Sequence, residues 1–296
     1  MSEKITAGIV LFNPDLEKLN SIITSLKKQL KFIYLIDNAS KNISEIEKLC
    51  RNESSDEFGI SLIKNNENKG IAAALNRIMK QASSDEYEWV LTLDHDSIPP
   101  DNLLSELEKY VELDNVGIVA PRILDINTNK FLHNEGEEEN NESNDYQLIK
   151  KCITSGSLVS TKAWLQVGKY DEYLFIDYVD FDFCIRMRKN GFKIVQANKI
   201  VMKHELGKMS IKRLLFKNVS VMNHNAMRKY YMIRNRIYCE YKYHNRFGFN
   251  NFVYIIKSII LIMLYEDNKG KKLKAVLKGA SDGVKDSKKI KIRKNK

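Results

Sequence analysis

Two aspartates stand two residues apart in the segment LTLDHDSIPPDNLL, where an apolar run ends. On extended backbone, side chains two positions apart point to the same side, so the carboxylates of Asp94 and Asp96 lie close together. Two like charges this close are unfavourable unless a cation lies between them or water screens both. The pair therefore indicates either a site for a divalent cation or a turn exposed to solvent.

The chemistry that such a cation would serve follows from what the sequence lacks. There is no phosphate loop of the GxxxxGK(S/T) type, and no GxGxxG segment follows the first expected strand. A ligand with a diphosphate group would need another source of positive charge, and a cation held by Asp94 and Asp96 would supply it. Carboxylate oxygens favour Mg²⁺ or Mn²⁺, and either ion could neutralise a departing diphosphate as a Lewis acid.

The elements around this pair alternate between strand and helix patterns. Apolar runs at residues 5–12, 32–36, 60–64 and 88–93 are typical of buried strands, and helical periodicity fills the intervals. This alternation predicts an α/β fold with a mostly parallel sheet and helices on both faces. Ligands of such sheets bind at the carboxyl ends of the strands. Five polar residues fall at or just after such ends: Asn13, Asp37, Asn68, Asp94 and Asp96.

Short signals set the expected ends of helices. Asn13 and Asp101 are placed to cap two of them, with Pro14 at the first helical position of the former. The second half of the chain is less regular. Residues 116–124 read as a strand and its exit, and residues 209–247 are expected to be mostly helical.

Composition is that of a globular protein with an ordinary core. The chain has 296 residues, of which 43% are hydrophobic, enough for one large domain or two smaller ones. Its four cysteines are scattered without CxxC or zinc spacing, which is typical of a reduced cytosolic protein. The first ten residues carry one lysine and a short strand pattern, so they do not resemble a secretory signal.

The net charge of +10 is confined to the C-terminal region. Residues 269–296 hold 12 Lys or Arg and two Asp, while residues 1–268 hold equal numbers of basic and acidic groups. Before this basic tail, residues 251–265 form an apolar run interrupted by Lys257 and Ser258. A membrane-spanning helix needs about 20 apolar residues, so this run is too short to span.

The C-terminal region therefore has three alternatives. In the first, the apolar run is a helix on a membrane surface and the basic tail is held by anionic lipid. In the second, the run is a core helix followed by a solvated tail. The third alternative, a basic arm that binds nucleic acid, lacks the aromatic and basic motif that would accompany it.

Six segments, taken in order, make the chain similar to a known family. They are the strand ITAGIVLFNPD, the turn LIDNAS, the segment NENKGIAAALN, the Asp-x-Asp of LDHDS, the run SGSLVSTKAWLQVGKYDEYLFIDYVDFDFCIRMRKNGFKI, and His204. Over residues 5–205 the sequence resembles glycosyltransferase family 2, whose GT-A fold is a Rossmann-like, mostly parallel sheet flanked by helices. Within that family it is most similar to bacterial rhamnosyltransferases of surface polysaccharide assembly.

The resemblance implies binding roles for individual positions. Nucleotide-binding positions of the family match Phe12, Asn13, Asp37, Asn68, Gly70 and Asp94, with Asp37 facing the base or the ribose. Metal-binding positions, for Mg²⁺ or Mn²⁺, match Asp94, Asp96 and His204. Arg234 lies in a stretch shared with related rhamnosyltransferases, where it could meet the diphosphate or belong to a helix that packs on the catalytic domain.

The general base of the family matches Asp180. Val179 occupies the position where the broad family carries a glutamate, and Asp177, three residues before Asp180, is the alternative base. The acceptor hydroxyl must lose its proton as it attacks the anomeric carbon, and burial can raise a carboxylate pKa of about 3.9 towards the working pH. Because the family inverts the anomeric centre in one displacement, no nucleophilic Ser or Cys is needed.

The resemblance therefore predicts an inverting, metal-dependent glycosyltransferase. It would move a sugar, L-rhamnose, from dTDP-rhamnose or a UDP-sugar to a hydroxyl of a growing, lipid-linked polysaccharide of the capsule or cell wall. Residues 1–205 would form the catalytic domain, with a nucleotide-binding half (1–115) and an acceptor half (116–205). Residues 206–296 would form a helical, basic extension that associates with the inner face of the cell membrane.

Two other functions use similar features. A nucleotidyltransferase also carries aspartates on a nucleotide-binding sheet, but it releases pyrophosphate instead of a nucleoside diphosphate. A non-catalytic protein that binds glycan or nucleic acid on the same scaffold is the other alternative, and the departure at Val179 keeps it open.

Overall fold

The computed structural model describes residues 3–132, 145–204, 210–214, 217–244, 246 and 248–294. Contacts along the chain divide it into two compact units. The first unit consists of Met1–Tyr173 and Val179–Glu205, and the second unit consists of Leu174–Tyr178 and Leu206–Lys296. The short segment Leu174–Tyr178 thus groups with the C-terminal region, although the first unit surrounds it in sequence.

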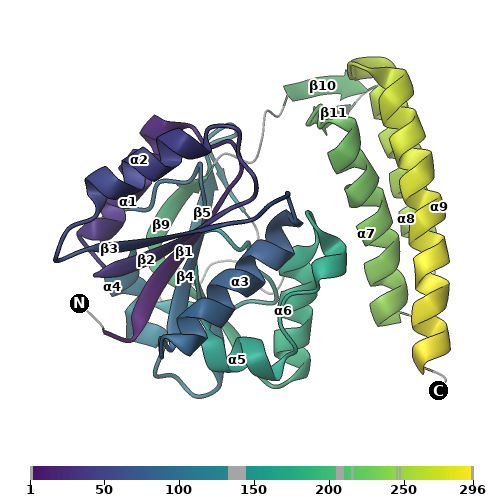
Figure 1. The fold of residues 1–296 in the computed structure, drawn as a ribbon. Helices are drawn as coiled ribbons and strands as arrows, with labels where there is room; N and C mark the ends of the chain where they lie inside the picture. The colour runs from purple at the N-terminus through teal and green to yellow at the C-terminus, as the bar shows by residue number, and fades with distance from the viewer. Residues whose placement is uncertain are drawn as a thin grey trace. The chain divides into compact units, whose positions relative to one another are not determined.

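The first unit is built on one large sheet (Figure 1). Its first four strands pair in parallel in the order β3-β2-β1-β4: β1 (Ile5–Leu11), β2 (Phe32–Asp37), β3 (Gly59–Lys64) and β4 (Trp89–Asp94). The other strands are β5 (Val116–Asp125), β6 (Lys130–Phe131), β7 (Tyr146–Leu148), β8 (Ser157–Ser160) and β9 (Lys193–His204). β8 runs antiparallel between β4 and β5, whereas β5 and β9 pair in parallel. The sheet is therefore parallel in its first half and mixed in its second.

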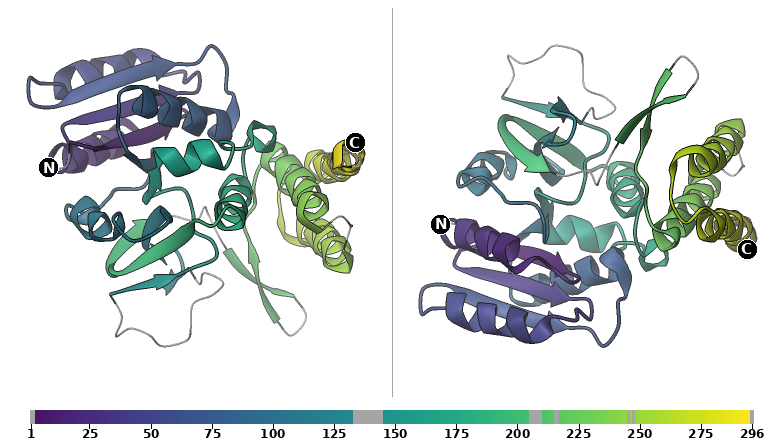
Figure 2. Two further views of the ribbon diagram at one scale, coloured as in Figure 1. Left: turned by 90° about the horizontal axis from the view of Figure 1, so that it is seen from below. Right: turned by 90° about the horizontal axis from the view of Figure 1, so that it is seen from above.

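Helices cover both faces of this sheet, as the alternation of patterns predicts (Figures 1 and 2). One face carries α1 (Leu16–Lys27), α2 (Ile43–Glu53) and α4 (Leu103–Leu107), and the other carries α3 (Gly70–Ser84), α5 (Thr161–Gln166) and α6 (Val179–Lys189). Short 3-10 turns follow α4 at Glu108–Tyr110 and precede α6 at Glu172–Leu174. The α/β class expected from the sequence is confirmed.

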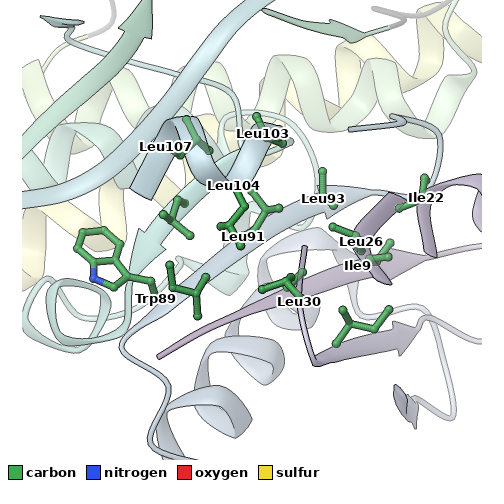
Figure 3. Packing of buried hydrophobic residues seen from close by; sticks show 14 of the residues in the cluster. Ile9, Ile22, Leu26, Leu30, Trp89, Leu91, Leu93, Leu103, Leu104 and Leu107 are labelled. Atoms are coloured by element: carbon green, nitrogen blue, oxygen red, sulfur yellow. The ribbon is translucent and has the colours of Figure 1, made fainter. Parts of the chain in front are cut away.

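The largest core lies between the strands and the face that carries α1. Ile9, Leu91 and Leu93 project from β1 and β4 towards Ile22 and Leu26 of α1, all of them buried (Figure 3). Leu103, Leu104 and Leu107 of α4 complete this layer. Full burial of each such side chain stabilises the fold by about 1.5–3 kcal/mol.

Two expected helix caps are wrong by one or two residues. Asp15, and not Asn13, caps α1, because its carboxylate accepts hydrogen bonds from the backbone amides of Glu17 and Lys18. The helix at Asp101 begins later than expected, at Leu103, with Asn102 in the cap position and no side-chain cap bond. The Asp101 carboxylate accepts instead from Ser25 of α1 and from Lys28, the residue after α1, which draws it away from the helix that follows it.

The described residues of the second unit form a hairpin and three helices (Figure 2). The hairpin pairs β10 (Ser210–Leu214) with β11 (Lys217–Val221). The helices are α7 (Ala226–His244), α8 (Phe249–Tyr265) and α9 (Lys269–Lys294). The expectation that residues 209–247 are mostly helical is therefore wrong for residues 210–214 and 217–221, which form strands. In the second of these strands, Val219 and Val221 favour this structure.

The basic segment after α8 is a helix that packs on α7. A Cβ added at Gly279 would lie 2.5 Å from the carbonyl oxygen of Tyr230, and one at Gly283 would lie 2.9 Å from that of Arg234. Only residues without a Cβ allow the two backbones to approach this closely. A solvated tail is therefore the wrong description of residues 269–287, because Gly279 and Gly283 pack against α7.

None of the helices in the described part of the chain combines the length and the apolar character needed to cross a membrane. α8 has 17 residues and buries only part of its surface within the second unit. Ile262 on one side of α8 is fully buried against Ile233, Ile237 and Val276.

Candidate active site

Polar side chains join the carboxyl ends of β1 and β2. The buried carboxylate of Asp37 accepts a hydrogen bond from the backbone amide of Ser40 at 3.0 Å. The Ser40 hydroxyl in turn accepts from the backbone amide of Asn13 at 2.8 Å, and the Asn13 side chain accepts from the amide of Lys41 at 2.8 Å. Asn13 has a φ of 49°, a left-handed conformation that this exchange of bonds holds in place. Two nucleotide-binding residues expected from the sequence thus share one network.

A second network carries on to the start of α3. The Asn38 amide donates to the carbonyl oxygen of Gly70 at 3.3 Å, and Asn65 donates to the Asn38 side chain at 2.8 Å. The Asn68 side chain accepts from the backbone amide of Gly70 at 2.9 Å. The structure therefore places Asn68 and Gly70 beside the end of β2, which is where a ligand at Asp37 would lie. Phe12 is 44% exposed at the end of β1.

Ser97 connects two of the three predicted metal ligands. Its hydroxyl donates to the carboxylate of Asp96 at 3.2 Å and forms a short hydrogen bond with Nδ1 of His204, which is 107 residues away in sequence. Ser97 itself is buried, whereas Asp96 is exposed. The backbone amide of Asp94 donates to Ser155 at 3.1 Å. The loop after β4 and the end of β9 therefore meet through a serine.

The three predicted ligands do not form a closed cage by themselves. Across the described residues, no group of three or more His, Cys, Asp or Glu side chains is close enough to hold a metal ion. The assignment of Asp94, Asp96 and His204 as metal ligands stays a prediction.

The two candidate bases lie in different units. Asp180 is the second residue of α6 in the first unit, is partly exposed, and accepts from the backbone amide of Phe181 at 2.9 Å. Asp177 belongs to the second unit, where Nε and Nη2 of Arg228 lie 3.1–3.3 Å from its carboxylate. Burial raises the pKa of Asp177 above its usual value, and the Arg228 guanidinium lowers it in part.

Arg234 is buried within the second unit. Its Nε and Nη2 donate to the side-chain oxygen of Asn235 at 2.9 and 2.7 Å, and its guanidinium lies over the Tyr231 ring at 4.7 Å. The expected diphosphate contact of Arg234 stays a prediction.

Sequence reasoning missed Ser97, Ser40 and Asn38. Each is a small polar residue within four positions of a predicted strand end, so its position was visible in the sequence. The partners described here were not visible, because they lie far away in the sequence. A further cavity of about 500 Å³ on the outer side of α3 is lined by cations including Lys69, Lys80 and Lys169, and it contains none of the predicted site residues.

The sequence is similar to those of known glycosyltransferases. Residues 6–174 match the family described as Glycosyl transferase family 2. A protein of Shigella flexneri, dTDP-rhamnosyl transferase RfbF, is 29% identical in an alignment of 294 residues that covers 96% of each chain.

Solved structures resemble the fold at low sequence identity. The mannosyltransferase PcManGT from Pyrobaculum calidifontis, in complex with GDP-Man and Mn²⁺, has a TM-score of 0.59 at 13% identity, covering 95% of this chain and 75% of that one. GalNAc-T7 with UDP, GalNAc and Mn²⁺ has a TM-score of 0.61 at 15% identity, covering 95% of this chain and 54% of that one. This likeness identifies the fold of the chain as GT-A.

Proposed function

Since the chain belongs to glycosyl transferase family 2 and is a glycosyltransferase, we propose that it transfers L-rhamnose from dTDP-rhamnose to a hydroxyl of a growing surface polysaccharide. The similarity to a dTDP-rhamnosyl transferase over nearly the whole chain supports this choice of sugar above a UDP-sugar donor. Residues 1–205 form the catalytic domain in this proposal, with the nucleotide in the half 1–115 and the acceptor in the half 116–205.

The nucleotide binds at the ends of β1 and β2. Phe12 offers an exposed ring to the base, and Asp37 receives the base or ribose beside Asn13. Asn68 and Gly70 wrap the nucleotide from the start of α3, with Asp94 on the ribose or metal side. The two networks support this arrangement because they fix Asn13, Asp37, Asn68 and Gly70 near the ends of β1 and β2.

The hydrogen bonds of Ser97 carry the proposal of a metal site. Because the Ser97 hydroxyl donates to Asp96, we assign it as an acceptor from Nδ1–H of His204, which leaves the lone pair of Nε2 for a metal. Asp94, Asp96 and His204 would then hold Mn²⁺ or Mg²⁺, since two carboxylates and one imidazole suit both ions. When bound, the ion supplies positive charge for the leaving diphosphate.

Asp180 is the general base in this proposal. Asp180 is preferred because it stands at the position that matches the base of the family, whereas the carboxylate of Asp177 pairs with Arg228. The acceptor hydroxyl gives its proton to Asp180 as its oxygen forms the bond to the anomeric carbon. The bond from that carbon to the diphosphate breaks with its electron pair, so the anomeric centre inverts in one step.

Product analysis with purified protein tests this function. Mn²⁺ or Mg²⁺ with dTDP-rhamnose and a glycan acceptor should yield dTDP, and Asp96→Ala and Asp180→Asn should each lower the rate by at least about a hundredfold. Release of pyrophosphate would favour a nucleotidyltransferase. Absence of turnover with every nucleotide sugar, from protein that still binds glycan, would favour a non-catalytic role.

The second unit supports a placement on the inner face of the cell membrane, next to a lipid-linked acceptor. Large apolar side chains of α8 are exposed at intervals of three or four residues, from 41% exposed at Ile256 and Ile260 to 78% at Phe249. This spacing places them in one stripe, opposite the buried Ile262. We name it the α8 stripe: Phe249, Phe252, Val253, Ile256, Ile260, Met263 and Leu264.

Charge complementarity favours an anionic lipid surface as the occupant of the α8 stripe. Exposed lysines lie near the stripe in sequence. Lys257 is within α8, and Lys269, Lys271 and Lys274 are at the start of α9. Each basic residue near an anionic surface contributes about 1 kcal/mol to binding, and the helix is too short to span. The proposal is therefore a helix lying in the plane of the membrane.

Co-sedimentation with vesicles tests this placement independently of catalysis. The full chain should pellet with vesicles that contain phosphatidylglycerol and much less with pure phosphatidylcholine, and Ile256→Glu together with Ile260→Glu should abolish pelleting. Leu165→Glu is the matched control, because Leu165 is a 51% exposed apolar residue on α5 in the first unit. A soluble dimer that the double variant dissociates would assign the stripe to a second copy instead.

A further inference from the structure

The segment Leu174–Tyr178 has an unusual backbone. Phe175, Asp177 and Tyr178 have φ values of 58°, 62° and 68°. Residues other than glycine pay about 1–3 kcal/mol each for such a conformation and keep it only when neighbouring groups enforce it. Three such residues within four positions require strong contacts from elsewhere.

Asn235 of α7 supplies the backbone contacts. Its side chain is fully buried, and Nδ2 lies 2.6, 2.8 and 2.9 Å from the carbonyl oxygens of Leu174, Ile176 and Asp177. The Asn235 oxygen accepts two hydrogen bonds from Arg234, which fixes the end of the amide that faces the segment. One amide group therefore holds three carbonyl oxygens of the segment close together.

Other residues of α7 hold the side chains of the same segment. The Phe175 ring stacks on Tyr231 with centroids 4.7 Å apart and planes 10° apart. Arg228 pairs with Asp177, and Arg236 donates to the Tyr178 hydroxyl at 3.2 Å. Arg228, Tyr231 and Asn235 are three and four residues apart, so they share one face of the helix. α7 thus contacts every residue of the segment whose φ is positive.

We propose that Asn235 is a positioning residue of the glycosyltransferase, which fixes the segment that carries Asp177 and leads directly into Asp180. Only Val179 separates Tyr178 from Asp180, so a change in the backbone of the segment moves the start of α6. The inference rests on the proposed function, because it assumes that an aspartate in this stretch takes the proton from the hydroxyl of the acceptor glycan. It adds that the C-terminal unit takes part in catalysis by holding this segment, besides any role at a membrane.

Asn235→Asp is the sharpest test. The substitution keeps the shape of the side chain, but it removes the amide donors and turns carboxylate oxygens towards three carbonyl oxygens. We expect kcat to fall about a hundredfold, as a displacement of about 1 Å near the reacting groups does, while KM for the donor nucleotide stays near that of the unchanged protein. Chymotrypsin should also cleave faster after Phe175 and Tyr178, because the segment is released.

Asn251→Asp is the matched control. Asn251 is a buried asparagine of the same unit whose oxygen accepts from Arg236 at 2.6 Å, and its Nδ2 finds no hydrogen-bond partner among the described residues. The same chemical change there removes no bond to the segment. It should leave kcat, KM and the rate of cleavage unchanged.

The outcomes separate this inference from the proposed function. A folded Asn235→Asp protein with unchanged kcat would overturn the inference, provided that Asp180→Asn is inactive. An active Asp180→Asn protein would instead overturn the assigned base. If Asn235→Asp does not fold, Tyr231→Leu decides, because it removes only the stacking on Phe175; unchanged kcat in that variant would also overturn the inference.

Discussion

The two units use polar side chains in opposite ways. In the first unit they stand at strand ends on top of a large apolar core, and most of their bonds go to nearby backbone amides. In the second unit they lie inside a small core around Ile233, Ile237 and Val276, where they hold helices and a strained segment together. Substitution of these residues should therefore alter ligand binding in the first unit, and in the second unit it should alter stability or the position of the segment that α7 holds.

The largest effect that would test this contrast is expected at Glu266. Its buried carboxylate pairs with Lys229 at 2.6 Å and Lys272 at 3.0 Å, and both lysines are also buried. Glu266→Gln leaves two buried cations without their counter-charge, which should destabilise the second unit by about 3–5 kcal/mol in urea unfolding. The more exposed pair of Lys278 with Asp282, whose carboxylate also accepts from the Tyr230 hydroxyl, is the control, and Asp282→Asn should cost much less than Glu266→Gln. An equal loss of unfolding free energy in the two variants would contradict the importance of the buried ion pairs in the second unit.

The next effect concerns the contact of α7 with α9. Gly279→Ala should destabilise the second unit by about 1–3 kcal/mol, because the new methyl group would press on the backbone of Tyr230. Gly270→Ala, in the first turn of α9, meets nothing within 4 Å and should leave stability unchanged or raise it by up to about 1 kcal/mol. Thermal unfolding of the two variants measures the difference, and a stable Gly279→Ala protein would contradict the packing.

In the first unit, a polar change should affect binding more than folding. Ser97→Ala removes the hydroxyl between Asp96 and His204 and should weaken Mn²⁺ binding about 10- to 100-fold, as measured by calorimetry in the presence of donor nucleotide. Ser25→Ala removes a buried hydroxyl that bonds to the carbonyl oxygen of Pro99, and it should leave Mn²⁺ affinity unchanged. Equal Mn²⁺ affinities of the two variants would show that Ser97 does not support the metal site.

The smallest effect is a pH dependence of the second unit. Burial, together with Arg228 and Lys229, lowers the pKa of His224 from 6.5 to about 4. The unfolded chain therefore binds a proton at higher pH than the folded chain, so the free energy of unfolding falls as the pH drops from about 6.5 to about 4. The raised pKa of Asp177 acts in the opposite direction at the acidic end of this range.

His224→Gln isolates this contribution. Between pH 7 and pH 5, the Tm of the variant should fall less than the Tm of the unchanged protein, because the variant lacks the group that gains a proton on unfolding. His244→Gln, at the exposed end of α7, is the control. Parallel Tm curves for the unchanged protein and the His224 variant would contradict the prediction.

Periodicity predicted most of the first unit. The four apolar runs match β1 to β4 within one residue at each end, because a buried strand needs an unbroken apolar stretch and a turn on either side. The positions of Asp37, Asn68 and Asp96 followed from these strand ends. Their partners did not, since the bond from Ser97 to His204 joins residues 107 apart in sequence.

The second unit was harder to predict from the sequence, because the pattern of small residues in α9 lies within a run of lysines. Gly279, Gly283 and Ser287 recur every four residues and mark the face of α9 that packs on α7, but they lie within a run of lysines that suggests a solvated tail. Asn235 stands next to an arginine in an otherwise unremarkable helical pattern. Its role depends on a strained segment 61 residues earlier, which no local signal reveals.

That separation in sequence has a consequence for synthesis. Ribosomes extend a chain at about 5–20 residues per second, so Leu174–Tyr178 leaves the ribosome several seconds before Asn235 does. Until then the segment lacks the Asn235 amide that bonds to its carbonyl oxygens. Under the positioning role proposed for Asn235, activity should therefore appear only after residue 235 has been translated.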